Sequence, residues 1–143
     1  MKKNLLIVVS IFAVIFTTAA QSTLTINVTE LEGDKGNLLI ALYNSPNDFL
    51  SAKAQGKVVQ IKGKTTKVIY ENLPDGLYAI ALFQDTNNNM TIDLQETGIP
   101  KEKYGFSNNI DPAKLSRIPN FEECSFPVNG NTDIQITAVS AIK

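Results

Sequence analysis

Histidine and tryptophan are absent from this sequence of 143 residues, and cysteine occurs once. Without histidine the chain can form neither a Ser-His-Asp triad nor a Cys-His pair, and it cannot hold a His-ligated zinc or copper ion. The single cysteine excludes an internal disulfide, so hydrophobic packing or a metal ion must stabilise the fold. We interpret Cys124 as a small buried core residue. The sequence also lacks GxGxxG, P-loop and GxSxG patterns.

Clusters of basic residues are missing as well, which argues against nucleic acid as a partner. The chain has 13 Lys and Arg against 14 Asp and Glu. No second apolar segment of membrane-spanning length follows the N-terminal one. These features are typical of a weakly acidic protein outside the nucleic-acid-binding classes.

The first twenty residues have the three parts of a secretory signal peptide. Lys2 and Lys3 are followed by an apolar run over 5–16 and by small residues over 17–20. The run is shorter than the ~20 residues that span a bilayer, so an uncleaved membrane anchor is the lesser alternative. We expect cleavage after Ala20 and a periplasmic or extracellular protein. Residues 21–143 would then form one domain.

Strand patterns dominate the rest of the chain. Residues 22–29 alternate between apolar and polar, whereas 37–43 and 77–84 are apolar on both faces, as in central strands. Segments 57–62 and 65–71 flank Gly63-Lys64 and predict a hairpin. Two further strands are expected at 124–128 and 132–140. The pattern predicts an all-β, Ig-like or prealbumin-like β-sandwich of about seven strands with one long irregular loop.

Tyr78 follows the turn sequence Pro74-Asp75-Gly76 at the start of an apolar strand. Sandwich domains often place a tyrosine there, with its hydroxyl bonded back to the corner of the chain. An ordinary strand tyrosine is an equal alternative.

The segment DTNNNMTIDLQE, residues 85–96, has the ligand spacing of a calcium loop. Oxygen-bearing side chains fall at positions 1, 3, 5, 9 and 12 of the twelve, and a backbone carbonyl would serve at position 7. The candidate ligands are Asp85, Asn87, Asn89, Thr91, Asp93 and Glu96. Calcium prefers six to eight oxygens from carboxylates, amides and carbonyls, which this set supplies.

Met90 occupies position 6, where calcium loops have glycine because the chain turns sharply. A side chain in that conformation costs about 1 kcal/mol or more. The loop also follows a strand, so it would be a calcium loop on a sandwich. The alternative is a polar hairpin held by side-chain-to-backbone hydrogen bonds.

The stretch 97–123 shows almost no strand alternation. A loop of that length is usually functional or hides an element that the pattern does not reveal. Tyr104, Phe106 and Phe121 are its aromatic residues. They are expected to fix the loop to the sandwich by apolar burial or, alternatively, to contact a small ligand or glycan.

Residues 73–109 resemble a family of exported bacterial proteins, the domain-of-unknown-function family 2141. The shared motifs are Leu-Pro-x-Gly-x-Tyr-Ala, Asp-x-Asn-x-Asn, Gly-x-Pro-x-Glu and Gly-Phe-Ser-Asn. They correspond here to Leu73, Pro74, Gly76, Tyr78 and Ala79; Asp85, Asn87 and Asn89; Gly98, Pro100 and Glu102; and Gly105, Phe106, Ser107 and Asn108, with a further match at Pro119, Phe121 and Glu122. Met90 departs from the family's usual glycine. The resemblance implies export and a sandwich fold, and it implies no established activity.

Residues 85–99 also resemble calcium loops of the B-type repeats in Gram-positive surface adhesins, where the metal stiffens a prealbumin-like sandwich. Three hypotheses follow. The first is a calcium-stiffened binding or structural module without catalytic activity, whose partner would be a cell-surface protein or glycan. The second is a small-ligand or glycan binder that uses the aromatic residues. The third is an enzyme in which Asp85, Asp93 or Glu102 acts as acid or base.

The signal-peptide pattern predicts that the mature chain begins at Gln21. Mass spectrometry of the protein recovered from its producing cell measures this directly. A product that is cytoplasmic and still carries residues 1–20 would contradict the prediction.

Overall fold

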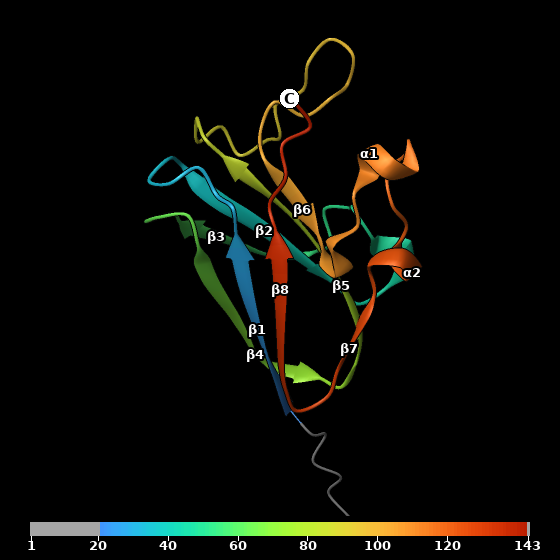
Figure 1. Ribbon diagram of the computed structural model, residues 1–143. Coiled ribbons are helices and arrows are strands. Elements are labelled where there is room, and N and C mark those ends of the chain that lie inside the picture. Colours follow the sequence, from blue (N-terminus) through green and yellow to red (C-terminus); the bar gives the residue numbers. More distant parts are fainter. Residues whose placement is uncertain (1–20, 143) are drawn as a thin grey trace, which may run out of the picture.

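The computed structural model describes residues 21–142 and folds them into two facing β-sheets (Figure 1). The signal peptide and its cleavage point after Ala20 lie outside the described residues. The elements are β1 (Gln21–Thr29), β2 (Asn37–Tyr43), η1 (Pro46–Asp48), β3 (Gln55–Gln60), β4 (Thr66–Pro74), β5 (Gly76–Asp85), β6 (Tyr104–Phe106), η2 (Ser107–Asn109), α1 (Pro112–Leu115), α2 (Phe121–Cys124), β7 (Phe126–Val128) and β8 (Asn131–Thr137). Within the described residues, no helix has the length and apolar character needed to cross a bilayer.

The smaller sheet has the order β4-β1-β8. Its central strand β1 alternates as predicted, and Leu24, Ile26 and Val28 are all fully buried. β1 pairs antiparallel with β4 and parallel with β8, which brings Ile26 opposite both Val68 and Ile134. The sheet therefore presents one apolar face to the interior and one polar face to solvent.

The larger sheet has the order β3-β2-β5-β6, and β7 also pairs with β5. Its central strands β2 and β5 are apolar on both faces, as the sequence predicts. Leu38, Ile40 and Leu42 point into the sandwich and are buried. The opposite face of the same strands carries small and aromatic residues, and β2 pairs with β5 so that Ala41 lies across from Ala81.

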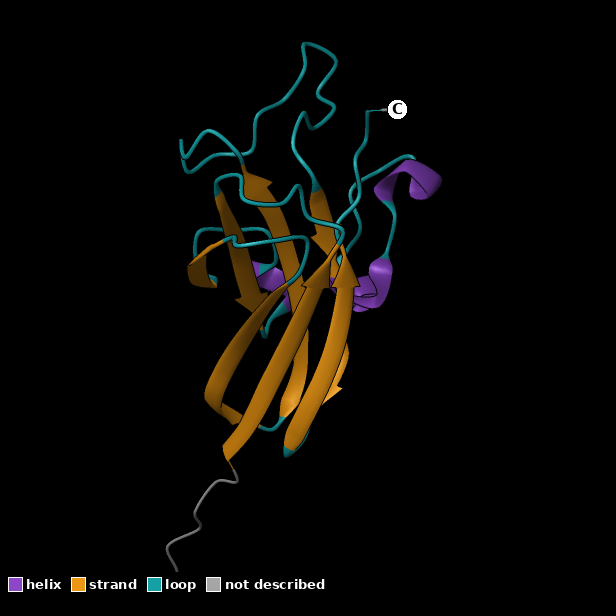
Figure 2. Ribbon diagram, turned by 60° about the vertical axis from the view of Figure 1, so that its left-hand side comes forward, coloured by secondary structure: helices purple, strands orange, loops and turns teal. Residues whose placement is uncertain are grey.

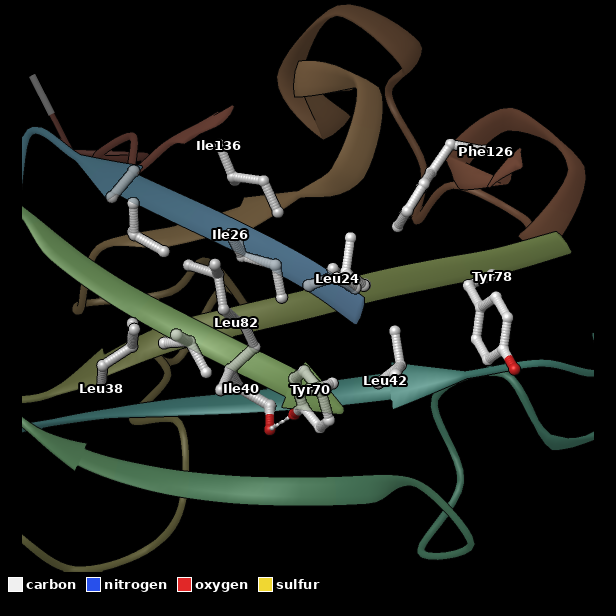
Figure 3. Close-up of a cluster of buried hydrophobic side chains, with 14 of the residues drawn as sticks. Leu24, Ile26, Leu38, Ile40, Leu42, Tyr70, Tyr78, Leu82, Phe126 and Ile136 are labelled. Carbon is white, nitrogen blue, oxygen red and sulfur yellow. Dashed lines mark hydrogen bonds between the residues drawn. The ribbon is translucent and has the colours of Figure 1, made fainter. Parts of the chain in front are cut away.

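Side chains from both sheets meet in one core (Figure 3). Burial of these aliphatic side chains is the main stabilising contribution to the fold. Tyr70 from β4 reaches the other sheet, where its hydroxyl lies 3.0 Å from the carbonyl oxygen of Gln55 and 3.4 Å from that of Ile40. The all-β sandwich predicted from the strand pattern is confirmed.

The predicted hairpin of 57–62 with 65–71 is wrong. β3 pairs with β2 in the larger sheet, whereas β4 pairs with β1 in the smaller one. The segment around Gly63 therefore carries the chain from one sheet to the other. The local Gly-Lys sequence is compatible both with a hairpin and with a crossing between the sheets. The crossing is favoured because Val68 and Tyr70 pair with the core-facing residues of β1.

The stretch 97–123 is more regular than its sequence pattern suggests, because it contains β6, η2, α1 and most of α2. The buried Ser107 hydroxyl accepts a hydrogen bond from the Ile80 backbone at 2.9 Å and donates to the Cys124 carbonyl at 2.6 Å. The Asn108 side chain donates to the carbonyls of Glu123 and Ser125. These contacts fasten α2 to β5, and α2 in turn delays the expected 124–128 strand until Phe126.

Tyr78 forms the corner contact that the sequence left open. Its ring is buried, and its hydroxyl donates to the Pro74 carbonyl at 2.8 Å. Burial, with a smaller contribution from the Asp75 charge, raises the pKa of Tyr78 above its usual value. The protonated hydroxyl therefore keeps this hydrogen bond over the ordinary pH range.

We predict that Gly105→Ala destabilises the sandwich, because β6 packs closely against both sheets. An added Cβ would lie 2.9 Å from Ile136 Cγ2 and 3.2 Å from Leu82 Cδ1. Overpacking of this kind costs about 1–3 kcal/mol. Thermal denaturation should show a midpoint several degrees lower. Gly56→Ala is the matched control, because nothing lies within 4 Å of its Cβ position. Equal midpoints for the two variants would contradict the prediction.

Candidate functional site

A compact loop begins where β5 ends at Asp85. The Asp85 side chain is fully buried, and its carboxylate accepts hydrogen bonds from the backbone N–H of Asn89 at 3.1 Å and of Met90 at 2.8 Å. Several connections gather with this loop at one end of the strands (Figure 2). The buried carboxylate thus determines how the chain folds back after β5.

Asp93 closes the loop from the other side. Its carboxylate accepts from the Asn87 amide at 2.6 Å and from the Asn89 amide at 3.2 Å. The Asn89 side-chain oxygen also accepts from the backbone N–H of Thr91 at 3.0 Å and from its hydroxyl at 3.1 Å. The structure therefore brings together five of the six predicted ligand residues.

Glu96 is the exception. After Asp93 the chain forms a narrow hairpin, in which Leu94 bridges to Pro100 and the Lys101 N–H donates to the Asp93 carbonyl. Glu96 lies in the exposed turn of this hairpin, next to the hydrogen bond from the Gly98 N–H to the Gln95 carbonyl. In a calcium loop of twelve residues, the side chain at position 12 reaches the ion because the chain continues there as a helix. Here the chain turns back as a hairpin, and Glu96 remains apart from the other predicted ligands.

Glu102 takes a place that the sequence pattern did not reveal. Its carboxylate is 5% exposed and spans the loop, accepting from the Thr86 N–H at 2.8 Å and from the Asp93 N–H at 3.1 Å. The signal in the sequence is weak, because Glu102 stands six residues beyond Glu96 and reaches the loop only through the hairpin. Glu102 thereby clamps the two ends of the loop.

Met90 has a φ of 65°, the left-handed conformation expected at position 6 of a calcium loop. Asn88 adopts the same region with a φ of 59°. The start of the loop also packs closely against Gly36, where an added Cβ would lie 1.9 Å from the Asp85 carbonyl oxygen. The loop therefore has the sharp turn of a calcium loop despite the side chain of Met90.

The donor set agrees with calcium only in part. Within residues 21–142, no three Asp, Glu or Cys side chains are placed to hold a metal ion. The loop offers instead two carboxylates, of Asp85 and Asp93, and two amide side chains. The amide nitrogens of Asn87 and Asn89 point at Asp93, and rotation about the Cβ–Cγ bond would present their oxygens instead. Such mixed oxygen donors suit calcium, with water completing the shell.

An open apolar cavity of about 710 Å³ lies beside the loop on the outer face of the larger sheet. Ala41 and Ala81, which are cross-strand neighbours, form its floor. The hairpin after Asp93 forms one wall, and the segment that begins with α1 forms another. The exposed aliphatic residues around it are Leu50, Ile92, Leu94, Ile99 and Ile118. We call this cavity the outer groove.

The three aromatic residues of 97–123 have different positions. Tyr104 and Phe106 line the outer groove, and their rings meet edge to face with centroids 6.2 Å apart. Phe121 is 6% exposed and packs on Phe49 beneath α2, away from the groove lining. Phe121 therefore fixes the loop to the sandwich, as one of the two interpretations predicts, whereas Tyr104 and Phe106 also face the groove.

The carboxylates considered for acid or base catalysis do not lie in this cavity. Asp85, Asp93 and Glu102 all form hydrogen bonds within the loop, and none of them lines the outer groove. Cys124 is buried as predicted, and burial raises the pKa of its thiol to about 11. The thiol therefore stays protonated and unreactive at neutral pH.

The fold and the loop define an all-β sandwich with an Asp- and Asn-rich loop at the end of a central strand. The chain belongs to the family DUF2141, described as an uncharacterized protein conserved in bacteria, whose model matches residues 26–136. This confirms the resemblance inferred from the motifs of residues 73–109. Comparison with curated proteins and with solved structures gives no match.

We predict that Glu102→Gln loosens the loop, because glutamine keeps only one of the two acceptor oxygens. The loss of a buried charge-assisted contact costs about 1–3 kcal/mol. Hydrogen exchange at Thr86 and Asp93 should accelerate, and the thermal midpoint should fall. Glu96→Gln, in the exposed turn, should stay within about 0.5 kcal/mol of the parent chain. Equal exchange rates at Thr86 and Asp93 in the two variants would contradict the role of Glu102 in holding the loop together.

Proposed function

We propose that this protein is an exported binding module without catalytic activity, in which calcium stiffens the 85–93 loop and the loop supports one wall of the outer groove. The observation that carries the proposal is the convergence of Asp85, Asn87, Asn89 and Asp93 at the base of the groove hairpin. A stiff loop would hold this hairpin in a binding-competent position.

The contacts between loop and hairpin support this connection. Asp93 contributes its side chain to the loop and its carbonyl to the hairpin ladder, where it accepts from Lys101 at 2.8 Å. Its neighbours Ile92 and Leu94 both line the outer groove. An ion that fixes Asp93 would therefore also fix two residues of the groove wall.

Calcium would be held by the carboxylates of Asp85 and Asp93, the amide oxygens of Asn87 and Asn89, and the backbone carbonyl of Thr91. Two carboxylates are a low formal charge for a calcium site, which implies weak binding. Extracellular calcium modules bind with dissociation constants of roughly 10⁻⁴ to 10⁻³ M, a range compatible with an exported protein.

Export is supported by the signal-peptide pattern of residues 1–20. Absence of catalysis is supported by the lack of histidine. It is also supported by the positions of Asp85, Asp93 and Glu102, whose carboxylates form hydrogen bonds within the loop and do not line the outer groove.

The second hypothesis, a small-ligand binder, gains support from the groove itself. Its volume lies within the ~300–1,000 Å³ typical of small-molecule sites, and its lining is largely apolar. Glycan binding is less favoured, because sugars stack on exposed aromatic faces and Tyr104 is 7% exposed. The two hypotheses are compatible, since the loop and the groove share the hairpin.

We predict that calcium raises the thermal midpoint of the protein and that a chelator lowers it again, by linkage of binding to folding. At ten times the dissociation constant the gain is about 1.4 kcal/mol, which is a shift of several degrees. Magnesium should have less effect, because it requires octahedral geometry and releases water reluctantly. Differential scanning calorimetry measures all three conditions.

Asp93→Asn should abolish the calcium-dependent shift, because it removes one of the two carboxylates and preserves the side-chain shape. Glu96→Gln should leave the shift unchanged, and Met90→Gly should raise the midpoint in calcium and in chelator alike, because Met90 is left-handed in the folded loop itself. If the thermal midpoint of the parent protein is the same in millimolar calcium and in chelator, the calcium proposal is wrong and the loop is a polar hairpin.

A further inference from the structure

We propose that the outer groove binds a single-chain anionic amphiphile, with its alkyl chain on the alanine floor and its carboxylate at Arg117. The inference deepens the proposed binding function and rests on it.

Exposed aliphatic residues are concentrated around the outer groove. Ten large hydrophobic residues of the described chain are exposed, and five of them surround this one groove. Single exposed hydrophobic residues are normal on a protein surface, whereas a concentrated patch indicates a binding site. Leu94 is 49% exposed and Ile118 is 68% exposed, so both would gain from contact with an apolar ligand.

The floor of the groove is formed by two small side chains. Ala41 and Ala81 lie opposite each other in the register of β2 and β5, and the next outward positions carry Leu39, Tyr43, Ala79 and Phe83. Tyr43 and Phe83 line the groove together with the two alanines, whose methyl groups form a depression beside these rings. A slender alkyl chain fits this depression, whereas the flat surface of a second protein would leave it unfilled.

One charged side chain, Arg117, lies at the groove, where it is paired with Glu123. Arg117 is the only charged residue among those lining the cavity. It donates to Glu123 from Nη1 at 2.9 Å and from Nη2 at 2.7 Å, and to the Ile118 carbonyl from Nη1 at 3.2 Å. These bonds use three of its five N–H donors and leave two. The ion pair with Glu123 thus positions a guanidinium that still has donors for a carboxylate.

Isothermal titration calorimetry with octanoate, decanoate and dodecanoate tests the proposal on the purified chain. Each added CH₂ group buried in the groove should tighten binding roughly fourfold. Dodecanol, which lacks the charge, should bind more weakly than dodecanoate. Absence of binding, or affinities independent of chain length, would overturn the proposal.

Two pairs of variants locate the site. Leu94→Ser should weaken dodecanoate binding about tenfold, whereas Leu77→Ser, an equally exposed leucine outside the groove, should not change it. Arg117→Gln should reduce the preference for dodecanoate over dodecanol, and Lys67→Gln, on β4 in the other sheet, should preserve it. Unchanged binding in Leu94→Ser would exclude the outer groove as the site, even if a fatty acid binds elsewhere.

The octanoate titration is repeated in calcium and in chelator to separate this inference from the proposed function, since longer fatty acids precipitate as calcium salts. Octanoate binding that is equal in both conditions supports the groove and contradicts a groove wall stiffened by calcium. A calcium-dependent thermal midpoint without any dodecanoate binding supports the stiffened loop and overturns the amphiphile.

Discussion

The apolar character of both faces of β5 is the constraint on which the rest of the molecule depends. One face of this strand enters the core with Ile80 and Leu82, both buried. The other face presents Ala81 and Phe83 outward, and a single sandwich has no third sheet to cover them. The segment between β5 and β7 is therefore long because it has to cover this outer face.

This segment covers only part of the outer face, and the uncovered part is the outer groove. Beneath α2, Phe121 and Cys124 pack on Ala79 and Tyr43, so this half of the face is sealed. Around Ala41 and Ala81 the hairpin and the α1 segment remain apart, and the outer groove stays open. Within the Gly-Phe-Ser-Asn motif, Ser107 and Asn108 belong to the sealed half and bond to α2, whereas Phe106 lines the outer groove. Ser107 and Asn108 thus have a structural role in this fold.

The sequence predicted the parts of the fold that depend on local periodicity. Alternation over 22–29 identified the core face of β1, and the doubly apolar segments identified β2 and β5 as central strands. The hairpin of 57–62 with 65–71 failed because strand pairing is a long-range choice that a local turn does not encode. β6 was missed because a three-residue strand is too short to show a period.

The candidate site was predictable to a similar extent. The spacing of Asp85, Asn87, Asn89 and Asp93 is local, and these residues do converge. The sequence pattern assigned Glu96 to the loop, whereas in the structure Glu102 contacts the loop. A linear pattern cannot distinguish a helical continuation from a hairpin that returns Glu102 to the loop. The outer groove could not be predicted from the sequence, because its lining comes from segments that are far apart in the chain, among them β2, β5, the 92–100 hairpin and the α1 segment.

The shared hairpin has a thermodynamic consequence if both proposed ligands bind. Calcium would act on Asp93, and the amphiphile would act on Ile92 and Leu94, the residues on either side of it. An ion that orders the hairpin removes part of the ordering entropy that the second ligand would otherwise have to offset. Linkage then requires the amphiphile to tighten calcium binding by the same factor. A dissociation constant close to the surrounding calcium concentration would therefore suit such a module, because a half-occupied site is the one whose occupancy responds most to the second ligand.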